Sequence, residues 1–161
     1  MLETTFVKSQ FGTFKVVGSE LGLQSVKLTE TVPDSIPATV HLQSVVAQLE
    51  EYFAGRRRHF EVEFDWGDAT EFNKSVWQEL LKIEYGHTTS YLAIAHQLNN
   101  PKAVRAVGMA NRNNPIAIIV PCHRVIASNG DLQGYFYGLD MKRALLELEN
   151  PMSFAQQGSL F

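Results

Sequence analysis

The only thiol in the chain, Cys122, lies in the segment IIVPCHRVI between two apolar runs. One cysteine cannot form an internal disulfide, and one thiol alone is a poor zinc site, so two interpretations remain. Cys122 could be a small buried apolar residue, as most free cysteines are. It could instead be a nucleophile, because the cationic neighbours His123 and Arg124 favour the attacking thiolate. The local composition leaves both interpretations open.

A wider motif surrounds this thiol. The segment NPIAIIVPCHRV at residues 114–125 follows NPKAVRAVGMANR at residues 100–112. Together they resemble the signature of the O6-alkylguanine-DNA alkyltransferases, also called methylated-DNA-protein-cysteine methyltransferases, over about the last ninety residues. The resemblance implies a single-turnover enzyme that needs no cofactor and no metal. It implies base flipping and irreversible transfer of an alkyl group from O6 of guanine, and from O4 of thymine, in duplex DNA to Cys122.

The same resemblance assigns catalytic roles to four further residues. His123 would remove the thiol proton through a water molecule, and Glu149 would orient its imidazole. Asn114 would brace the turn before the cysteine, and Tyr91 would donate to the flipped base. Each of these residues also has an ordinary explanation, such as a solvated histidine, a surface acid, an Asn-Pro turn or a core tyrosine. The functional interpretation therefore depends on their occurring together at these spacings.

The resemblance also implies a DNA-binding surface and a base pocket. Arg105 would fill the gap that the flipped base leaves in the duplex, which offsets part of the unstacking cost. The other DNA-binding candidates are Lys102, Ala103, Ala106, Gly108 and Arg112. The pocket candidates are Tyr135, Phe136, Tyr137, Val125 and Pro121.

Several positions depart from the family pattern. Small residues usually follow the pocket tyrosine, whereas Phe136 and Tyr137 follow it here. This bulk predicts an altered tolerance for large adducts such as benzyl. Val104 and Met109 replace small residues that are common on the recognition helix. The chain lacks the extra cysteine that an N-terminal zinc site in some family members uses.

Alternation of apolar and polar residues predicts how the first half of the chain folds. Residues 5–15 and 16–28 alternate around glycines, which is typical of an antiparallel meander. Residues 40–54 have helical spacing up to Gly55, and residues 60–64 predict an edge strand. The best domain boundary lies within residues 65–71. We therefore expect an α+β fold whose first domain, residues 1–72, is a small antiparallel sheet plus a helix.

The second domain, residues 73–161, is predicted to be mostly helical, with a winged-helix-like helix-turn-helix. An apolar face that includes Val76, Trp77, Leu80, Leu81 and Ile83 would end near Gly86. Thr89 or Ser90 would cap the next helix, and Asn100 would cap a third with Pro101 in its first turn. Asp140 would cap a last helix that buries Leu139, Ala144, Leu145 and Leu148. The tail is expected to be partly disordered, with Phe154, Leu160 and Phe161 able to dock.

The net charge of −3 hides an asymmetry between the two halves. Residues 1–72 carry six Lys and Arg against eleven Asp and Glu, whereas residues 73–161 carry eight against six. Between Lys102 and Arg124 there are four basic residues and no acid, a stripe that suits a phosphate backbone. The run Arg56–Arg58 is interpreted instead as a solvated helix end. We expect alkylated double-stranded DNA, held at its minor groove, as the partner.

The remaining expectations concern assembly, location and rival functions. No apolar run approaches a membrane span, so a cytoplasmic monomer is expected, with cooperative binding on DNA left open. A non-catalytic lesion-sensing relative is the nearest rival, but it would lack the nucleophile at position 122. A helix-turn-helix transcription regulator would explain the basic helix and not the PCHRV segment.

Overall fold

The computed structural model describes residues 1–132 and 134–152, and it divides into two compact units. The first comprises residues 1–68 and 115–117, and the second comprises residues 69–114 and the chain from 118 onward. The division after Asp68 falls inside the boundary segment expected from the sequence. Together the units have the α+β composition that was predicted. The predicted tail residues Phe154, Leu160 and Phe161 lie outside the described residues.

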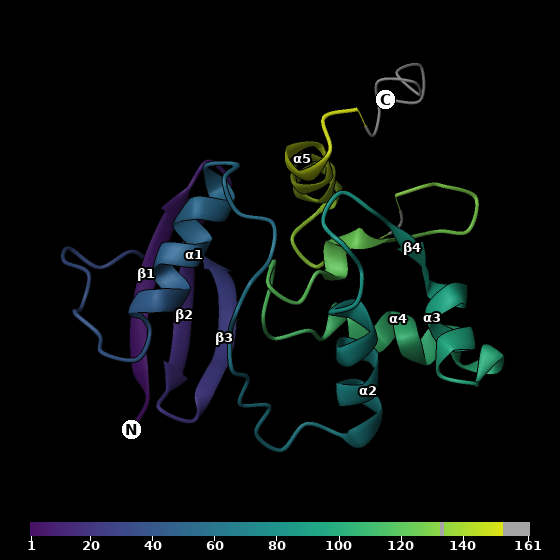
Figure 1. The fold of residues 1–161 in the computed structure, drawn as a ribbon, viewed down its shortest axis with the longest axis horizontal. Helices are drawn as coiled ribbons and strands as arrows, with labels where there is room; N and C mark the ends of the chain where they lie inside the picture. The colour runs from purple at the N-terminus through teal and green to yellow at the C-terminus, as the bar shows by residue number, and fades with distance from the viewer. Residues whose placement is uncertain (133, 153–161) are drawn as a thin grey trace. The chain divides into compact units, whose positions relative to one another are not determined.

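The first unit is a three-stranded antiparallel sheet with a helix across one face (Figure 1). Its strands β1 (Glu3–Ser9), β2 (Gly12–Ser19) and β3 (Gly22–Thr29) are joined by tight hairpins. The φ of Gly22 is 141°, and a Cβ there would lie 2.7 Å from the carbonyl carbon of Phe64, so only glycine fits this turn. Helix α1 (Gln43–Phe53) covers the sheet with its buried residues Val45, Leu49, Tyr52 and Phe53.

The predicted edge strand at residues 60–64 is reduced to a single parallel bridge between Leu23 and Phe64. The backbone of Glu61 is bonded elsewhere, because its N–H donates to Gln48 Oε1 at 2.8 Å and its carbonyl accepts from Gln48 Nε2 at 3.0 Å. The side-chain amide of Gln48 on α1 thus satisfies the backbone groups that would form hydrogen bonds to a neighbouring strand in a longer edge strand. Further along β3, the backbone of Val26 forms hydrogen bonds with the backbone of Pro115 and Ala117. The sequence did not indicate this pairing.

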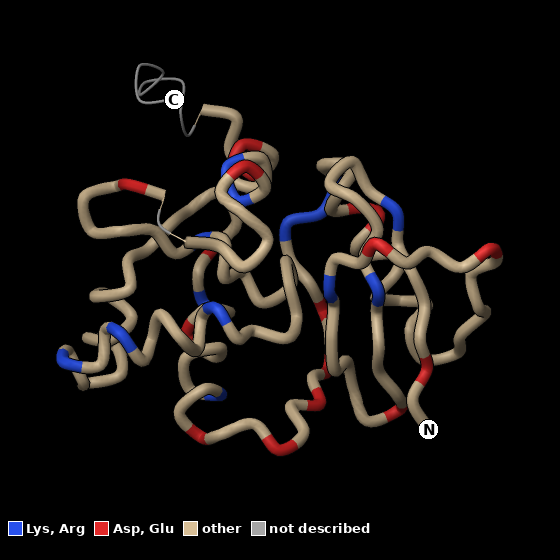
Figure 2. The backbone as a smooth tube through the Cα atoms, turned by 180° about the vertical axis from the view of Figure 1, so that it is seen from behind, with Lys and Arg blue, Asp and Glu red and all other residues tan. Residues whose placement is uncertain are grey.

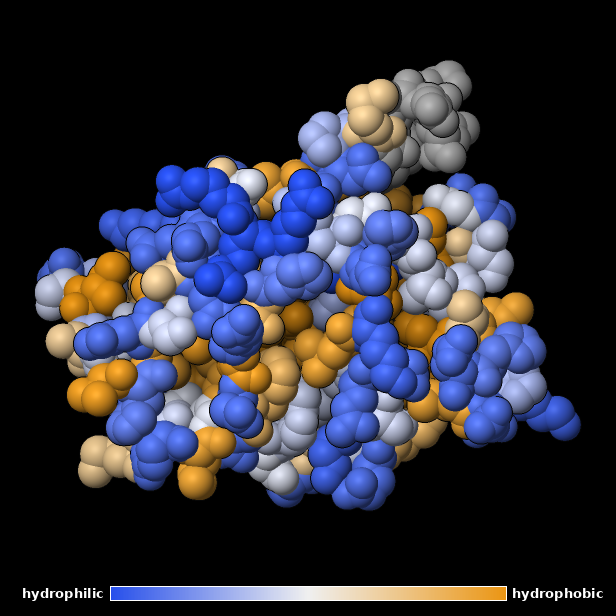
Figure 3. All heavy atoms as spheres, in the orientation of Figure 1, coloured by the Kyte–Doolittle hydropathy of each residue, from blue (hydrophilic) through white to orange (hydrophobic). Residues whose placement is uncertain are grey.

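The arginine run after α1 is a solvated segment, as interpreted from the sequence. Arg56 and Arg58 are exposed, and Arg57 pairs with Glu51 across 3.1 Å. Figure 3 shows strongly hydrophilic side chains gathered where α1 ends. Among the described residues, no helix is both long enough and apolar enough to cross a membrane.

The second unit packs three helices and ties them to the cysteine segment. Helices α2 (Glu71–Leu80), α3 (Tyr91–Gln97) and α4 (Val104–Arg112) contact one another, and the 3-10 turn η1 (Pro101–Ala103) leads into α4. Trp77 fixes α2 against α4 by donating its indole N–H to the Ala110 carbonyl at 2.8 Å. The short strand β4 (Thr89–Ser90), just before α3, pairs in parallel with β5 (Val125–Ile126). Helix α5 (Leu139–Glu149) follows.

Several predicted helix boundaries need correction. Helix α2 starts at Glu71, with Thr70 as its cap, and ends at Leu80 rather than near Gly86. Ser90 caps α3 as predicted, by accepting from the Ala93 N–H at 3.0 Å. Asn100 makes no capping bond with its side chain, because the chain there enters a 3-10 turn before α4.

The start of the last helix also differs from the prediction. Gly138, with φ of 98°, is the N-cap of α5, so Asp140 lies inside the first turn and cannot cap it. Because the helix starts here, Leu139 is exposed although it was expected to be buried. Leu146 is buried in the core in place of Leu139. The buried face of α5 therefore holds Leu145 and Leu146 together with the polar residues Lys142 and Glu149.

Candidate active site

A tight turn presents Cys122 at the surface of the core. Pro121, with φ of −83° and ψ of 63°, is the central residue of an inverse γ-turn in which the Cys122 N–H donates to the Val120 carbonyl at 2.8 Å. Proline suits this position because its ring fixes φ near the required value. Asn114 Nδ2 donates to the same carbonyl at 2.8 Å, so Asn114 braces the turn from outside. A 3-10 turn, η2 (Cys122–Arg124), then carries the chain into β5.

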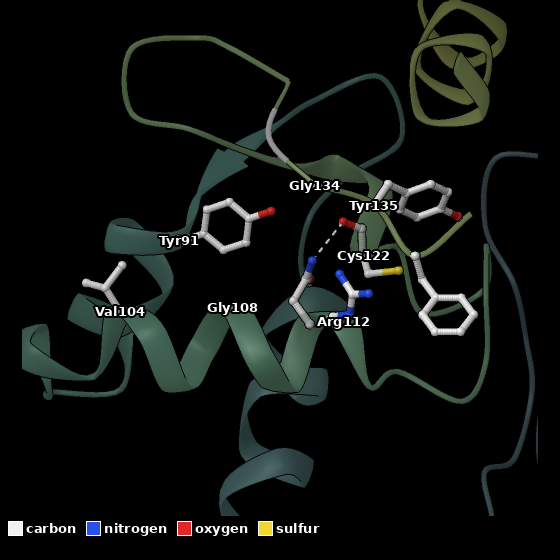
Figure 4. Close-up of a pocket in the computed structure, with 9 residues that line it drawn as sticks. Tyr91, Val104, Gly108, Arg112, Cys122, Gly134 and Tyr135 are labelled. Atoms are coloured by element: carbon white, nitrogen blue, oxygen red, sulfur yellow. Dashed lines mark hydrogen bonds between the residues drawn. The ribbon is translucent and has the colours of Figure 1, made fainter. Parts of the chain in front are cut away.

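The thiol borders a cavity of about 340 Å³ within the second unit. Figure 4 shows Tyr91 on α3 with its hydroxyl directed into the space beside Cys122, and Tyr135 on the opposite side. The residues that line the cavity are Tyr91, Val104, Gly108, Asn111, Arg112, Cys122, Gly134, Tyr135 and Phe136. Because the lining is mostly apolar with a few polar groups, the cavity suits a flat heterocycle better than a charged ligand.

A buried polar cluster lies behind the cysteine. His123 Nε2 is 2.6 Å from Glu149 Oε2, and neither side chain is accessible to solvent. Arg124 donates to both oxygens of the same carboxylate, through Nε at 2.7 Å and through Nη2 at 3.1 Å. Its Nη1 donates to the Ile83 carbonyl at 2.6 Å. Each charge in the cluster therefore has a partner, as buried charges require.

The protonation states of this cluster follow from its geometry. Burial raises the pKa of Glu149, but His123 and Arg124 more than offset burial and bring that pKa well below its usual value. Glu149 is therefore a carboxylate, which can only accept a hydrogen bond. His123 Nε2 must then carry the hydrogen and donate it to Glu149. Nδ1 then bears the lone pair, and that atom has no hydrogen-bond partner within residues 1–132 and 134–152. The imidazole therefore keeps one basic nitrogen that no hydrogen bond among the described residues uses.

The thiol and the imidazole are both neutral at rest. Burial raises the pKa of Cys122, although a hydrogen bond from Asn114 and the nearby charge of Lys142 act in the opposite direction. Burial likewise lowers the pKa of His123, partly countered by Glu149. A protonated thiol beside a neutral imidazole is the correct starting state for general-base catalysis. The thiolate would form only when the base removes the proton.

The sequence did not indicate Lys142 or Asn111 as residues of the site, and it indicated a different role for Arg124. Lys142 is buried, and its Nζ donates to the carbonyls of Val125 and Gly134, with the latter at 3.1 Å. Burial lowers its pKa to about 8, and the nearby thiol partly counters this effect. Asn111 Nδ2 donates to the Cys122 carbonyl at 3.3 Å. Arg124 was assigned to the phosphate-binding stripe, which is wrong, because Arg124 is buried against Glu149.

A sequence signal did exist for Lys142. It lies three, four and seven residues before Leu145, Leu146 and Glu149, so all four share one face of α5. A lysine on an apolar helix face indicates either a buried partner or a stem that reaches the surface. Asn111 gave no comparable signal, because its burial depends on how α4 packs against the cysteine segment.

The DNA-binding candidates lie along η1 and α4. Lys102, Arg105 and Arg112 are exposed, and Figure 2 shows blue segments along these elements. Ala106 is exposed beside them, whereas Ala103 and Gly108 are half-buried. Ala110, which has similar spacing, is fully buried in the core and does not share the exposed face.

The pocket candidates divide into two groups. Tyr135 and Phe136 line the cavity, and Arg112 lies over the Phe136 ring with 5.8 Å between its guanidinium carbon and the ring centroid. Tyr137 packs edge-on against both aromatic rings. Pro121 and Val125 are buried behind the cysteine and are not among the lining residues. Among the described residues, no group of three or more His, Cys, Asp or Glu side chains could hold a metal ion.

Comparisons with known proteins agree with this arrangement. Residues 2–66 match the ribonuclease-like domain of 6-O-methylguanine DNA methyltransferase, and residues 71–151 match its DNA binding domain. A methylated-DNA-protein-cysteine methyltransferase of Methanosarcina acetivorans is 48% identical over 148 residues, which cover 88% of this chain and 94% of the relative.

Solved structures give the same result. The O6-methylguanine methyltransferase of Mycobacterium tuberculosis has a TM-score of 0.83 at 43% identity and covers 94% of both chains. The structure of Mycobacterium tuberculosis OGT in complex with DNA has a TM-score of 0.82 at 44% identity, with 91% of each chain covered. The fold and the site thus define a protein with a ribonuclease-like domain and a DNA binding domain, and the second of these contains the buried Cys122. The chain belongs to the 6-O-methylguanine DNA methyltransferase family.

Proposed function

We propose that this chain repairs alkylated double-stranded DNA by moving an alkyl group from O6 of guanine onto Cys122 in one irreversible step. One observation carries the proposal: the only thiol borders a base-sized cavity next to an imidazole whose free Nδ1 is backed by a buried carboxylate. Family membership supports the same chemistry. A non-catalytic lesion sensor and a transcription regulator are disfavoured because neither function needs this thiol and base.

The first step activates the nucleophile. A water molecule between the two groups passes the Cys122 proton to His123 Nδ1, and the Glu149 carboxylate stabilises the resulting imidazolium. The thiolate sulfur then attacks the alkyl carbon while the bond between that carbon and O6 breaks. A thiolate is a soft, strong nucleophile toward saturated carbon. Since a thioether has no easy route back to the thiol, each protein molecule acts once.

The second requirement is charge stabilisation on the departing base. The bonding electrons pass to O6 and spread over the guanine ring, which must gain one proton to become ordinary guanine. Burial, with a further contribution from Cys122, raises the pKa of Tyr91, so its hydroxyl stays protonated and donates a hydrogen bond to the base. The proton lost by the thiol replaces the alkyl group on guanine, so the reaction is balanced without a cofactor or a metal.

DNA reaches the site through a helix-turn-helix made of α3, η1 and α4. Lys102 and Arg112 contact phosphates, and the small exposed Ala106 lets α4 approach the floor of the minor groove. Few side chains on this face can read base edges, so binding is nearly independent of sequence. The damaged base flips into the cavity, and Arg105 fills its place in the stack.

The proposal extends to substrate range and cellular setting. O4-alkylthymine is a second substrate of the same cavity. The lining of the cavity is mostly apolar, so it does not exclude alkylated bases other than guanine. The protein acts in the cytoplasm as a monomer.

A covalent labelling experiment tests the proposal. Duplex DNA with a labelled methyl group on O6 of guanine is incubated with the wild-type protein and with Cys122→Ala, and transfer is followed on a denaturing gel. Wild type should acquire the label, and Cys122→Ala should bind the duplex without acquiring it. Labelling of Cys122→Ala, or binding of wild type without any labelling, would overturn the proposal.

A further inference from the structure

A stacked pair of side chains joins the end of α4 to the aromatic loop that follows the cysteine segment. The guanidinium carbon of Arg112 lies 5.8 Å from the centroid of the Phe136 ring. Both residues line the cavity, and both are exposed to solvent at its rim. Figure 4 shows Arg112 at the end of α4 among the lining residues. Because position 136 usually holds a small residue in the family, this pair is a feature of this chain.

The Phe136 ring is itself held by its neighbours. It packs edge-on against Tyr137, with 5.0 Å between the ring centroids and 80° between the ring planes. Tyr137 packs in the same way against Tyr135, with 5.7 Å between the centroids. Edge-to-face contacts are a favourable arrangement for aromatic rings, so the loop presents Phe136 to Arg112 in a defined orientation.

The stacked guanidinium keeps its capacity to bind an anion. Among the residues that the structure describes, no carboxylate pairs with Arg112. Stacking uses only the flat face of the guanidinium, whereas its five N–H donors lie in the plane of the group. Two of these donors can therefore bind one anion while the ring stays in place. Without the ring, an exposed arginine would sample many rotamers.

The position of the pair identifies the anion. A base that enters the cavity stays joined to its sugar, so the neighbouring phosphates lie at the rim, where Arg112 is found. Phosphate oxygens also suit two parallel N–H donors of one arginine. A carboxylate from a protein partner would have the right charge, but it does not arrive together with the base.

We propose that Phe136 is a positioning residue, which holds the Arg112 guanidinium ready to bind a phosphate beside the flipped nucleotide. The inference rests on the proposed function and adds a preformed phosphate contact at the rim of the cavity. Binding benefits because the Arg112 side chain is already restricted before DNA arrives, so less conformational entropy is lost in the complex.

Equilibrium binding to a duplex with one O6-methylguanine tests the proposal in a Cys122→Ala background, where transfer does not occur. Phe136→Leu keeps apolar bulk and loses the ring face, so its Kd should rise about fivefold. Its salt dependence should stay the same, because Arg112 still reaches the phosphate. Phe136→Tyr keeps the ring and should match the parent protein. Leu139→Ala, which removes another exposed apolar side chain three residues further on, should match it as well.

A double-mutant cycle shows whether Phe136 acts through Arg112. Arg112→Ala should weaken binding and lower the salt dependence by about one phosphate contact. Adding Phe136→Leu to Arg112→Ala should then change the Kd no further. The role of Phe136 is overturned if Phe136→Leu has the same effect with and without Arg112, leaves the Kd unchanged or tightens binding. The cycle does not depend on transfer, so failure of wild type in the labelling experiment would count against the proposed function alone.

Discussion

His123 donates through Nε2 to Glu149 Oε2 at 2.6 Å, with both side chains closed to solvent. This bond fixes the tautomer of the imidazole and aims its basic nitrogen away from the carboxylate. Glu149 also satisfies Arg124, so one carboxylate orients the base and neutralises a buried cation. Catalytic geometry and stability are therefore coupled at position 149.

Glu149→Gln should impair both properties. Loss of the charged partner removes the stabilisation of the imidazolium, so the single-turnover rate should fall by about 100-fold. Leaving Arg124 buried without its counterion should cost about 3 kcal/mol of unfolding free energy. Transfer kinetics and denaturant unfolding measure the two effects. Glu147→Gln, which disturbs only the partly exposed pair with Arg143, should change either quantity little.

Stability should decline as the solution is acidified. Burial holds the pKa of His123 below its usual 6.5, so the unfolded chain binds more protons once the pH falls below 6.5. The lowered pKa of Glu149 adds a second loss below its usual 4.5, since the folded state resists protonation there. Melting temperature should thus be steady near pH 7, fall below pH 6.5 and fall further below pH 4.5. A melting temperature that rises between pH 6.5 and 5 would contradict these assignments.

Lys142→Met should slow transfer by about tenfold. The substitution removes a positive charge that favours the thiolate and also breaks the link between the Val125 and Gly134 carbonyls. The slowing should shrink at higher pH, where Lys142, with its pKa lowered to about 8, loses its charge in wild type. Rate–pH profiles of both proteins check this. Arg143→Met, on the next residue of α5, is the matched control, and an equal loss there would point to a general effect on the helix.

Aromatic bulk at the cavity should control adduct size. Phe136 lines the cavity and is stacked beneath Arg112, so it narrows the space available to a large alkyl group. Wild type should therefore react with methyl and benzyl donors at clearly different rates. Phe136→Ser should raise the benzyl rate relative to the methyl rate by roughly tenfold if steric exclusion dominates. Equal wild-type rates for both donors would refute a role for this bulk.

Arg105→Ala should separate base flipping from chemistry. If Arg105 fills the vacated stack, its loss should slow transfer from duplex DNA by about tenfold or more and leave transfer from a single-stranded oligonucleotide nearly unchanged. Lys102→Ala should instead weaken binding to all sequences and lower the salt dependence by about one phosphate contact. If Arg105→Ala slowed transfer from duplex and from single-stranded DNA equally, Arg105 would not act by filling the stack.

The sequence was most informative where a local motif carries the chemistry. The PCHRV segment made Cys122 and His123 the candidate nucleophile and base, and Pro121 there sets a turn that local geometry alone explains. Asn111 and the pairing of Arg124 with Glu149 depend on packing between distant segments, so the sequence could not reveal them. Lys142 could have been found from its position on the buried face of α5. The predicted helix cap at Asn100 was wrong because a 3-10 turn precedes α4. The predicted cap at Asp140 was wrong because Gly138 is the N-cap of α5.

The most direct test of the central claim is intact mass measurement after incubation with duplex DNA that carries O6-methylguanine. We predict that every active molecule gains one methyl group in place of one hydrogen, that peptide mapping places the gain on Cys122, and that excess substrate adds no more. An unchanged mass, or a gain that maps to any other residue, would contradict it.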